Sequence, residues 1–173
     1  RIAGEIFDRV REYYELVHKE KKFVPFKTSV SYAGRVFDER EMISLVDSAL
    51  DFWLTLGPYG DRFEKKMRDF FGARDFILVN SGSSANLVAI GSLMAPELEG
   101  HLEAGDEVIT PAVTFPSTLA PILQNGLIPV LVDAEVGTYN INPHLIEEAI
   151  SPRTRAIFVP HTLGNPCDMD IIG

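Results

Sequence analysis

Three short segments of the sequence combine residues that could bind a phosphorylated or a flat ligand. The first, residues 80–84 (Asn-Ser-Gly-Ser-Ser), follows an apolar run and precedes a helical pattern. A helix that begins there exposes unpaired N–H groups and the positive end of its dipole, which favours an anion. Gly82 lets the backbone approach a ligand, and Ser83 and Ser84 add hydroxyl donors. The segment is typical of a phosphate site, but a serine that merely caps the helix explains these residue types equally well.

The second and third segments follow two later apolar runs. Residues 110–118 contain Phe115, whose ring could stack on a flat ligand. The alternative is that Phe115 belongs to the hydrophobic core, where a single phenylalanine is more often found. Residues 160–166 contain His161 and Asn165, and the alternative for such a histidine is a purely structural role. Because all three segments follow predicted strands, we expect them at the carboxyl edge of one sheet, where α/β proteins bind ligands.

The elements that must position these segments follow from the hydrophobic pattern after residue 72. Short apolar runs predict buried strands at residues 76–79, 107–110, 128–132 and 156–159. Helical patterns separate them at residues 81–93, 116–124 and 143–150. Strands that alternate with helices predict an α/β fold with a mostly parallel sheet flanked by helices.

The first 72 residues have a different pattern, in which apolar residues recur at helical spacing. Helices are predicted over residues 1–22, 38–56 and 59–71, with an extended stretch at 23–32. Asp38 and Glu41 have the spacing of a capping box, and Gly57 and Gly72 are expected to end helices. We therefore expect a helical N-terminal arm over residues 1–72 and an α/β domain over 73–173.

Composition and missing motifs exclude several classes of protein. The 173 residues carry 16 basic and 25 acidic side chains, a net charge of −9, which argues against nucleic acid as the main partner. No apolar run approaches the ~20 residues of a membrane span. The single cysteine, Cys167, excludes an internal disulfide framework, fits a reducing, cytoplasmic compartment, and leaves no cysteine set for a metal. The motifs of dinucleotide-binding Rossmann domains, P-loop NTPases and α/β-hydrolases are missing.

The order and spacing of the motifs resemble the DegT/StrS-type family of sugar aminotransferases, which are pyridoxal-phosphate enzymes of fold type I (aspartate aminotransferase-like). The similarity runs from about Gly34 to Gly173, in residues 57–64, 80–85, 106–109, 114–118, 129–133 and 138–141. Within this family, residues 48–55, 79–87, 124–126 and 161–166 resemble the CDP-4-keto-6-deoxyglucose 3-dehydrase branch. Family aminotransferases tend to have Gly-Thr in the phosphate loop and His-x-Tyr-Gly in the last turn, where this sequence has Gly-Ser-Ser and His-Thr-Leu-Gly.

The resemblance implies roles for the candidate residues around pyridoxal or pyridoxamine phosphate (PLP or PMP). Six are implied at the cofactor: Gly82, Ser83 and Ser84 at its phosphate, Phe115 on its ring, and His161 and Asn165 in a turn that faces it. Thr55 and Gly57 are implied near the nucleotide-sugar substrate, and no metal ligand is expected. The Schiff-base residue (Lys in aminotransferases, His in the dehydrase branch) and the acidic partner of the pyridine nitrogen are expected beyond Gly173. The 173-residue chain alone is therefore expected to be inactive.

The activity that the resemblance implies is C-3 dehydration and deoxygenation of a CDP-4-keto-6-deoxyhexose with PMP, in lipopolysaccharide (O-antigen) dideoxysugar biosynthesis. One alternative is a PLP-dependent aminotransferase that acts on a nucleotide keto-sugar. A second is a non-catalytic module that binds a sugar phosphate or a nucleotide. The resemblance also implies a homodimer, a 2Fe–2S cluster held by downstream cysteines, and a flavin or iron–sulfur reductase as a partner.

Overall fold

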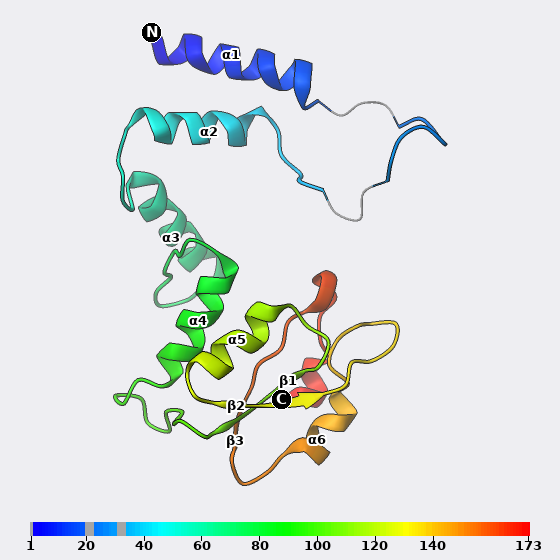
Figure 1. Ribbon diagram of the computed structural model, residues 1–173. Helices are drawn as coiled ribbons and strands as arrows, with labels where there is room; N and C mark the ends of the chain where they lie inside the picture. The colour runs from blue at the N-terminus through cyan, green and yellow to red at the C-terminus, as the bar shows by residue number, and fades with distance from the viewer. Residues whose placement is uncertain (1, 20–22, 31–33) are drawn as a thin grey trace. The chain divides into compact units, whose positions relative to one another are not determined.

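The computed structural model describes residues 2–19, 23–30 and 34–173 of the chain (Figure 1). It divides into two compact units, residues 1–78 and 79–173, whereas the sequence pattern places the boundary after residue 72. Within the described residues, no helix is both long and apolar enough to cross a membrane.

The N-terminal unit is helical, as its apolar spacing predicts. Its helices are α1 (Ile2–Val17), α2 (Glu39–Leu50) and α3 (Pro58–Phe71). Helices α1 and α2 pack together. The predicted capping box at the start of α2 is confirmed, because the Asp38 side chain accepts a backbone N–H of the first turn and Glu41 accepts the Asp38 N–H. Gly72 ends α3 in the left-handed conformation, with a φ of 61°.

Two predictions for this unit need correction. Helix α2 ends at Leu50, not near residue 56, because Phe52 adopts a left-handed φ of 49° through which a helix cannot continue. The stretch expected to be extended contains a turn at residues 25–28, in which Phe26 has a φ of 63°. Residues 1 and 20–22 of the predicted first helix and residues 31–32 of the predicted extended stretch lie outside the described residues.

The C-terminal unit is an α/β structure with a parallel sheet, which confirms the predicted fold class. Its sheet has the strand order β2-β1-β3 in the described part of the chain, and both neighbours run parallel to the central strand β1. In register, Ile109 of β1 lies opposite Val130 of β2 and Ile157 of β3. The elements are α4 (Gly82–Leu93), β1 (Glu107–Pro111), α5 (Pro116–Gln124), β2 (Ile128–Val132), α6 (Ile146–Ala149), β3 (Thr154–Ile157) and α7 (Met169–Ile172).

The strand predicted at residues 76–79 is wrong: this segment is not part of the sheet. The Leu78 N–H donates to the Glu64 carboxylate at 2.8 Å, where a strand would bond to a neighbouring backbone. The Phe76 ring packs against Phe63 and Phe71 of α3. Ile77 and Leu78 stay exposed, at 72% and 39%, so α3 covers only part of this apolar run.

Two other predicted elements are shorter or displaced. The helix predicted over residues 143–150 begins as a 3-10 turn at Pro143–Leu145 and is α-helical only over α6. Strand β3 begins at Thr154 and ends at Ile157, two residues earlier than predicted at each end.

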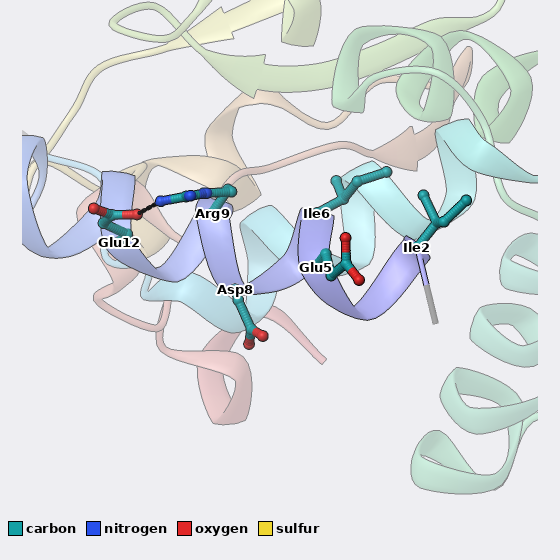
Figure 2. Close-up of a pocket in the computed structure, with 6 residues that line it drawn as sticks. All are labelled: Ile2, Glu5, Ile6, Asp8, Arg9 and Glu12. Atoms are coloured by element: carbon teal, nitrogen blue, oxygen red, sulfur yellow. Dashed lines mark hydrogen bonds and ion pairs between the residues drawn. The ribbon is translucent and has the colours of Figure 1, made fainter.

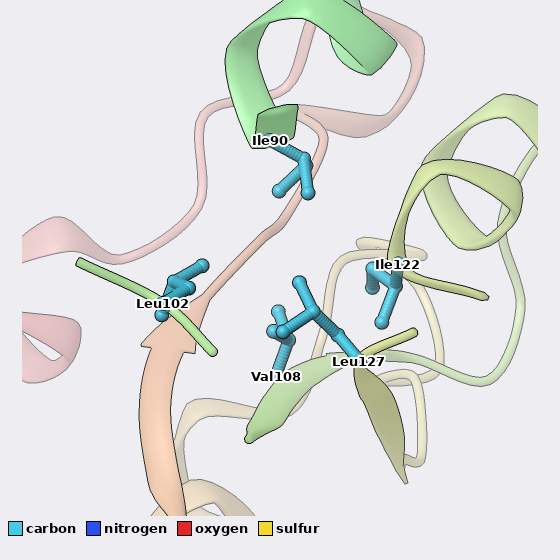
Figure 3. Packing of buried hydrophobic residues seen from close by; sticks show 5 residues of the cluster. All are labelled: Ile90, Leu102, Val108, Ile122 and Leu127. Atoms are coloured by element: carbon cyan, nitrogen blue, oxygen red, sulfur yellow. The ribbon is translucent and has the colours of Figure 1, made fainter. Parts of the chain in front are cut away.

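The central strand β1 is buried along its whole length and has a hydrophobic cluster on each face. Val108 and Ile109 point to opposite faces because successive side chains alternate along a strand. The Val108 cluster, drawn in Figure 3, lies beneath α4 and α5 and contains Ile90, Leu102, Val108, Ile122 and Leu127. The Ile109 cluster lies on the α6 side and contains Ile109, Val132, Ile141, Ile146 and Cys167. The core therefore fixes the start of α5 at the carboxyl edge of the sheet.

Candidate functional site

The start of α4 has both features that residues 80–84 suggested, a cap and free N–H groups. Ser81 is the N-cap residue, and its Oγ accepts the Ser84 N–H at 3.2 Å. A helix leaves its first four N–H groups without helical partners. The cap uses the group of Ser84, and Ala85 bonds back to the Ser81 carbonyl. The N–H groups of Gly82 and Ser83 have no partner among the described residues. The cap therefore leaves two donors available to an anion.

A cavity of about 340 Å³ brings Ser83 and Ser84 together with Phe115, whereas Gly82 is not one of its lining residues. Ser83 and Ser84 line it from α4, and Phe115 lines it from the start of α5. Phe115 is 71% exposed, so the interpretation of this ring as a core residue is wrong. The other lining residues are Leu87, Pro116, Ser117, Ala120, Pro121 and Gln124. One cavity thus combines a helix N-terminus, two hydroxyl groups and an exposed aromatic ring.

One hydrogen bond ties the two helices that form this cavity. Pro121 lies inside α5 and has no N–H, so the Ser117 carbonyl one turn earlier lacks its helical partner. The Asn86 side chain of α4 donates to this carbonyl at 3.0 Å. Behind this bond, Ile90 and Ile122 meet in the Val108 cluster. The sequence pattern did not reveal that Asn86 positions these helices. The signal that could have revealed it is Pro121, because a proline inside a helix leaves a carbonyl that needs another donor.

His161 and Asn165 lie in the turn that follows β3, and neither lines the cavity around Phe115. The Cys167 N–H donates to Nδ1 of His161 at 3.0 Å. Because a backbone nitrogen can only donate, Nδ1 is the acceptor, and Nε2 is the ring nitrogen that carries the proton in the neutral imidazole. Since β1 and β3 are parallel neighbours, this turn and the segment that leads to Phe115 leave the same edge of the sheet.

This carboxyl edge holds polar atoms that the described residues do not satisfy. The hydroxyl oxygens of Thr110, Thr114 and Thr162 are buried, and the structure gives none of them a hydrogen-bond partner within the described residues. Thr110 and Thr114 lie at and after the end of β1, and Thr162 follows β3. Buried polar atoms without partners are uncommon in folded proteins. Their position here indicates an edge that a polar ligand or another segment completes.

The two candidate substrate residues lie in the N-terminal unit, in the loop between α2 and α3. Thr55 and Gly57 line a cavity of about 200 Å³ in this unit. A Cβ at Gly57 would lie 2.8 Å from Cδ1 of Trp53, so any other residue there would displace the Trp53 ring. The Trp53 indole donates to the Leu56 carbonyl at 3.1 Å, which holds the ring in that place.

The same loop is fixed where it enters α3. The Tyr59 hydroxyl donates to the Asp47 carboxylate of α2, and this hydrogen bond raises the pKa of Tyr59. The Arg62 guanidinium lies over the Tyr59 ring, 4.3 Å from its centre. These contacts connect the end of α2 to the start of α3, and they bracket the loop that carries Thr55.

Another hollow, of about 540 Å³, lies along α1 and contains none of the predicted site residues (Figure 2). Its lining includes Ile2 and Ile6 beside an ion pair between Arg9 and Glu12 at 2.6 Å. This is the side of a single amphipathic helix. No group of three or more His, Cys, Asp or Glu side chains in the described ranges is placed to hold a metal ion.

Comparison with known proteins gives consistent results for this chain. Residues 37–173 match the model of the DegT/DnrJ/EryC1/StrS aminotransferase family. A dTDP-4-dehydro-2,6-dideoxy-D-glucose 3-dehydratase of Saccharopolyspora spinosa is 48% identical over 96% of this chain and 36% of that protein. The lipopolysaccharide biosynthesis protein RfbH of Salmonella typhimurium is 44% identical over 95% of this chain and 38% of that protein.

A solved structure agrees with these sequence relatives. The E. coli GDP-4-keto-6-deoxy-D-mannose 3-dehydratase with bound hydrated PLP superimposes with a TM-score of 0.73 at 35% identity. The match covers 81% of this chain and 36% of that one. The chain thus spans little more than a third of the length of each of these relatives, 36% and 38% of the two sequences and 36% of the structure. Its fold is part of the PLP-dependent fold type I. The chain belongs to the DegT/DnrJ/EryC1/StrS aminotransferase family.

Proposed function

We propose that the chain is part of a PMP- or PLP-dependent enzyme that removes the C-3 hydroxyl of a nucleotide-linked 4-keto-6-deoxyhexose, as one step towards a dideoxysugar. The cavity that joins the α4 N-terminus to Phe115 carries the proposal, because it pairs a site for a phosphate with a site for a flat ring. Relatives that are named as 3-dehydratases support dehydration over other reactions. A CDP-linked sugar is the expectation from the resemblance, and the relatives add dTDP- and GDP-linked sugars as candidates.

The residues of the cavity fit the phosphate of such a cofactor. The free N–H groups of Gly82, which begins α4, and of Ser83, which lines the cavity, lie at the positive end of the α4 dipole, which favours a dianion. The hydroxyls of Ser83 and Ser84 add donors at the same end. When bound, the cofactor supplies an electron sink that stabilises negative charge on the carbon next to its nitrogen.

The remaining residues orient the ring and limit water. Phe115 offers an exposed aromatic face for stacking, and Leu87 and Pro116 give the cavity apolar walls. At the carboxyl edge of the sheet, His161 can donate a hydrogen bond from Nε2, and Asn165 lies in the same turn as His161. Thr55 and Gly57 are proposed to contact the nucleotide sugar. The homodimer, the 2Fe–2S cluster and the reductase partner stay predictions.

The alternative reaction is transamination, which the name of the family itself favours. Both reactions use the same phosphate and ring contacts, so the cavity does not separate them. The Schiff-base residue would separate them, and it is expected beyond residue 173.

One experiment distinguishes the activities. The full-length protein is incubated with PMP, a reductant and, in parallel, the CDP-, dTDP- and GDP-linked 4-keto-6-deoxyhexoses, and the products are identified by mass spectrometry. A sugar that has lost its C-3 hydroxyl is the expected product. A 4-amino sugar formed from glutamate and PLP contradicts dehydration and supports transamination. Binding of the sugar without turnover supports the non-catalytic module.

A proline at position 82 tests the phosphate site itself. Gly82 is the first residue of α4, where proline is tolerated, and Ser81 before it is extended, with a φ of −163° and a ψ of 161°, as a residue before proline prefers. Gly82→Pro therefore removes one free N–H and leaves the helix intact. Hydrogen bonds to charged groups contribute about 1.5–3 kcal/mol, so the cofactor Kd should rise roughly 10- to 150-fold. An unchanged Kd, measured by absorbance titration, would remove the α4 N-terminus from the site.

A further inference from the structure

A buried asparagine outside every predicted site holds the turn that carries His161. Asn140 is 5% exposed, and all its side-chain hydrogen-bonding groups face the backbone of this turn. Nδ2 donates to the carbonyls of Asn165 and Pro166, at 3.0 and 3.1 Å. Oδ1 accepts the Thr162 N–H at 2.9 Å. One side chain thus connects the start of the turn to its end.

The turn needs such support because its backbone is strained. Leu163 and Gly164 both have left-handed conformations, with φ values of 56° and 79°. A leucine adopts this conformation only where its surroundings impose it. Leu163 is 90% exposed, so packing of its side chain does not impose it. The three hydrogen bonds from Asn140 span Leu163 and Gly164, together with a backbone bond from the Asn165 N–H to the Thr162 carbonyl at 3.0 Å. The Cys167 thiol also reaches the Pro160 carbonyl, at 3.2 Å.

The turn also determines which ring nitrogen of His161 accepts a hydrogen bond. His161 immediately precedes Thr162, whose N–H Asn140 fixes. At the other end of the turn, Asn140 donates to the Pro166 carbonyl. The next residue is Cys167, whose N–H donates to Nδ1 of His161 at 3.0 Å. The two ends of the turn must stay together for this bond to form. With Nδ1 accepting, the ring proton stays on Nε2.

We propose that Asn140 is a positioning residue for His161: it closes the 161–167 turn so that the imidazole presents Nε2–H as its donor at the carboxyl edge of the sheet. The part of this proposal that concerns the reaction rests on the proposed function. The part that concerns the tautomer rests on the turn alone.

The test uses nitrogen NMR of the full-length protein, in which long-range proton–nitrogen correlations report which ring nitrogen carries the proton. The unmodified protein should show His161 as the Nε2–H tautomer. Asn140→Ala should give a mixture of tautomers and, at saturating cofactor, a kcat reduced by about 100-fold, the loss that a misplacement of about 1 Å can cause. Asn140→Asp keeps the acceptor for Thr162 but turns an oxygen instead of a donor towards the two carbonyls, so it should disturb the tautomer as well.

Asn142→Ala is the matched control, since Asn142 lies two residues away and caps only its own 3-10 turn through the His144 N–H at 3.1 Å. It should leave the tautomer and kcat unchanged. A proton on Nδ1 in the unmodified protein overturns the proposal without any variant, and so does an unchanged tautomer in folded Asn140→Ala or Asn140→Asp. If the tautomer shifts as expected and the unmodified protein dehydrates no sugar, the proposed function fails and the positioning role stands.

Discussion

Replacing Phe115 by alanine should separate ligand binding from folding. Because Phe115 is 71% exposed, only roughly 60 Å² of a side chain of about 200 Å² is covered by protein. At about 25 cal/mol per Å², that area stabilises the fold by at most about 1.5 kcal/mol. Stacking of a flat ring on an aromatic side chain contributes about 1–3 kcal/mol by alanine substitution. Phe115→Ala should therefore weaken cofactor binding about 5- to 150-fold, with a small loss of stability.

The assay compares two phenylalanines of the same unit in the full-length protein. Phe158 is half-buried and packs against the Val108 cluster, so Phe158→Ala should cost more of the free energy of unfolding than Phe115→Ala, up to about 3 kcal/mol. Urea denaturation measures that energy, and titration with PLP measures the Kd. The reasoning is refuted if Phe115→Ala destabilises the protein as much as Phe158→Ala, or if its Kd for PLP equals that of the unmodified protein.

Three further predictions concern folding. Ser81→Ala removes the N-cap of α4 and should cost about 1 kcal/mol in urea denaturation; a loss below about 0.3 kcal/mol would show that the cap is not formed. Gly57→Ala should displace the Trp53 ring, 2.8 Å from the new Cβ, and change the tryptophan fluorescence spectrum; an unchanged spectrum would contradict the close approach. The Ser151 hydroxyl and the Arg153 guanidinium hold the pKa of Glu107 below its ordinary value of 4.5. A lowered folded-state pKa adds stability that is complete above pH 4.5 and disappears as the pH falls through the folded-state pKa. Glu107→Gln should therefore reduce the loss of urea resistance below pH 4.5, and an identical loss in both proteins would exclude this role.

Elements with a complete local signal could be predicted from the sequence. Helix α5 begins and ends at the predicted residues because Pro116 at its first position and Gly126 after it are local signals. The 76–79 segment could not be assigned correctly, because an apolar run by itself does not distinguish a strand from a segment that packs on a helix. There, the decisive contact is the bond from Leu78 to Glu64, 14 residues away.

The candidate site also contains features that local sequence signals predict and features that depend on distant contacts. The cap at Ser81 could be predicted from residue type and position, whereas the exposure of Phe115 could not, because a phenylalanine is by its type alone more often buried. The role of Asn140 could not, because its partners lie 22 to 26 residues further along the chain. Nothing in its own neighbourhood distinguishes it from Asn142, which only caps a short turn.

The proline inside α5 also has a consequence for the motions of the cavity. It leaves the Ser117 carbonyl to Asn86, so neither helix can fray at this level without breaking a bond to the other. Cooperative units of local opening consist of segments that share such bonds. Helices α4 and α5 should then exchange their amide hydrogens as a single unit. A ligand would enter past the exposed Phe115 side chain, which lines the cavity, while the helical frame stays closed.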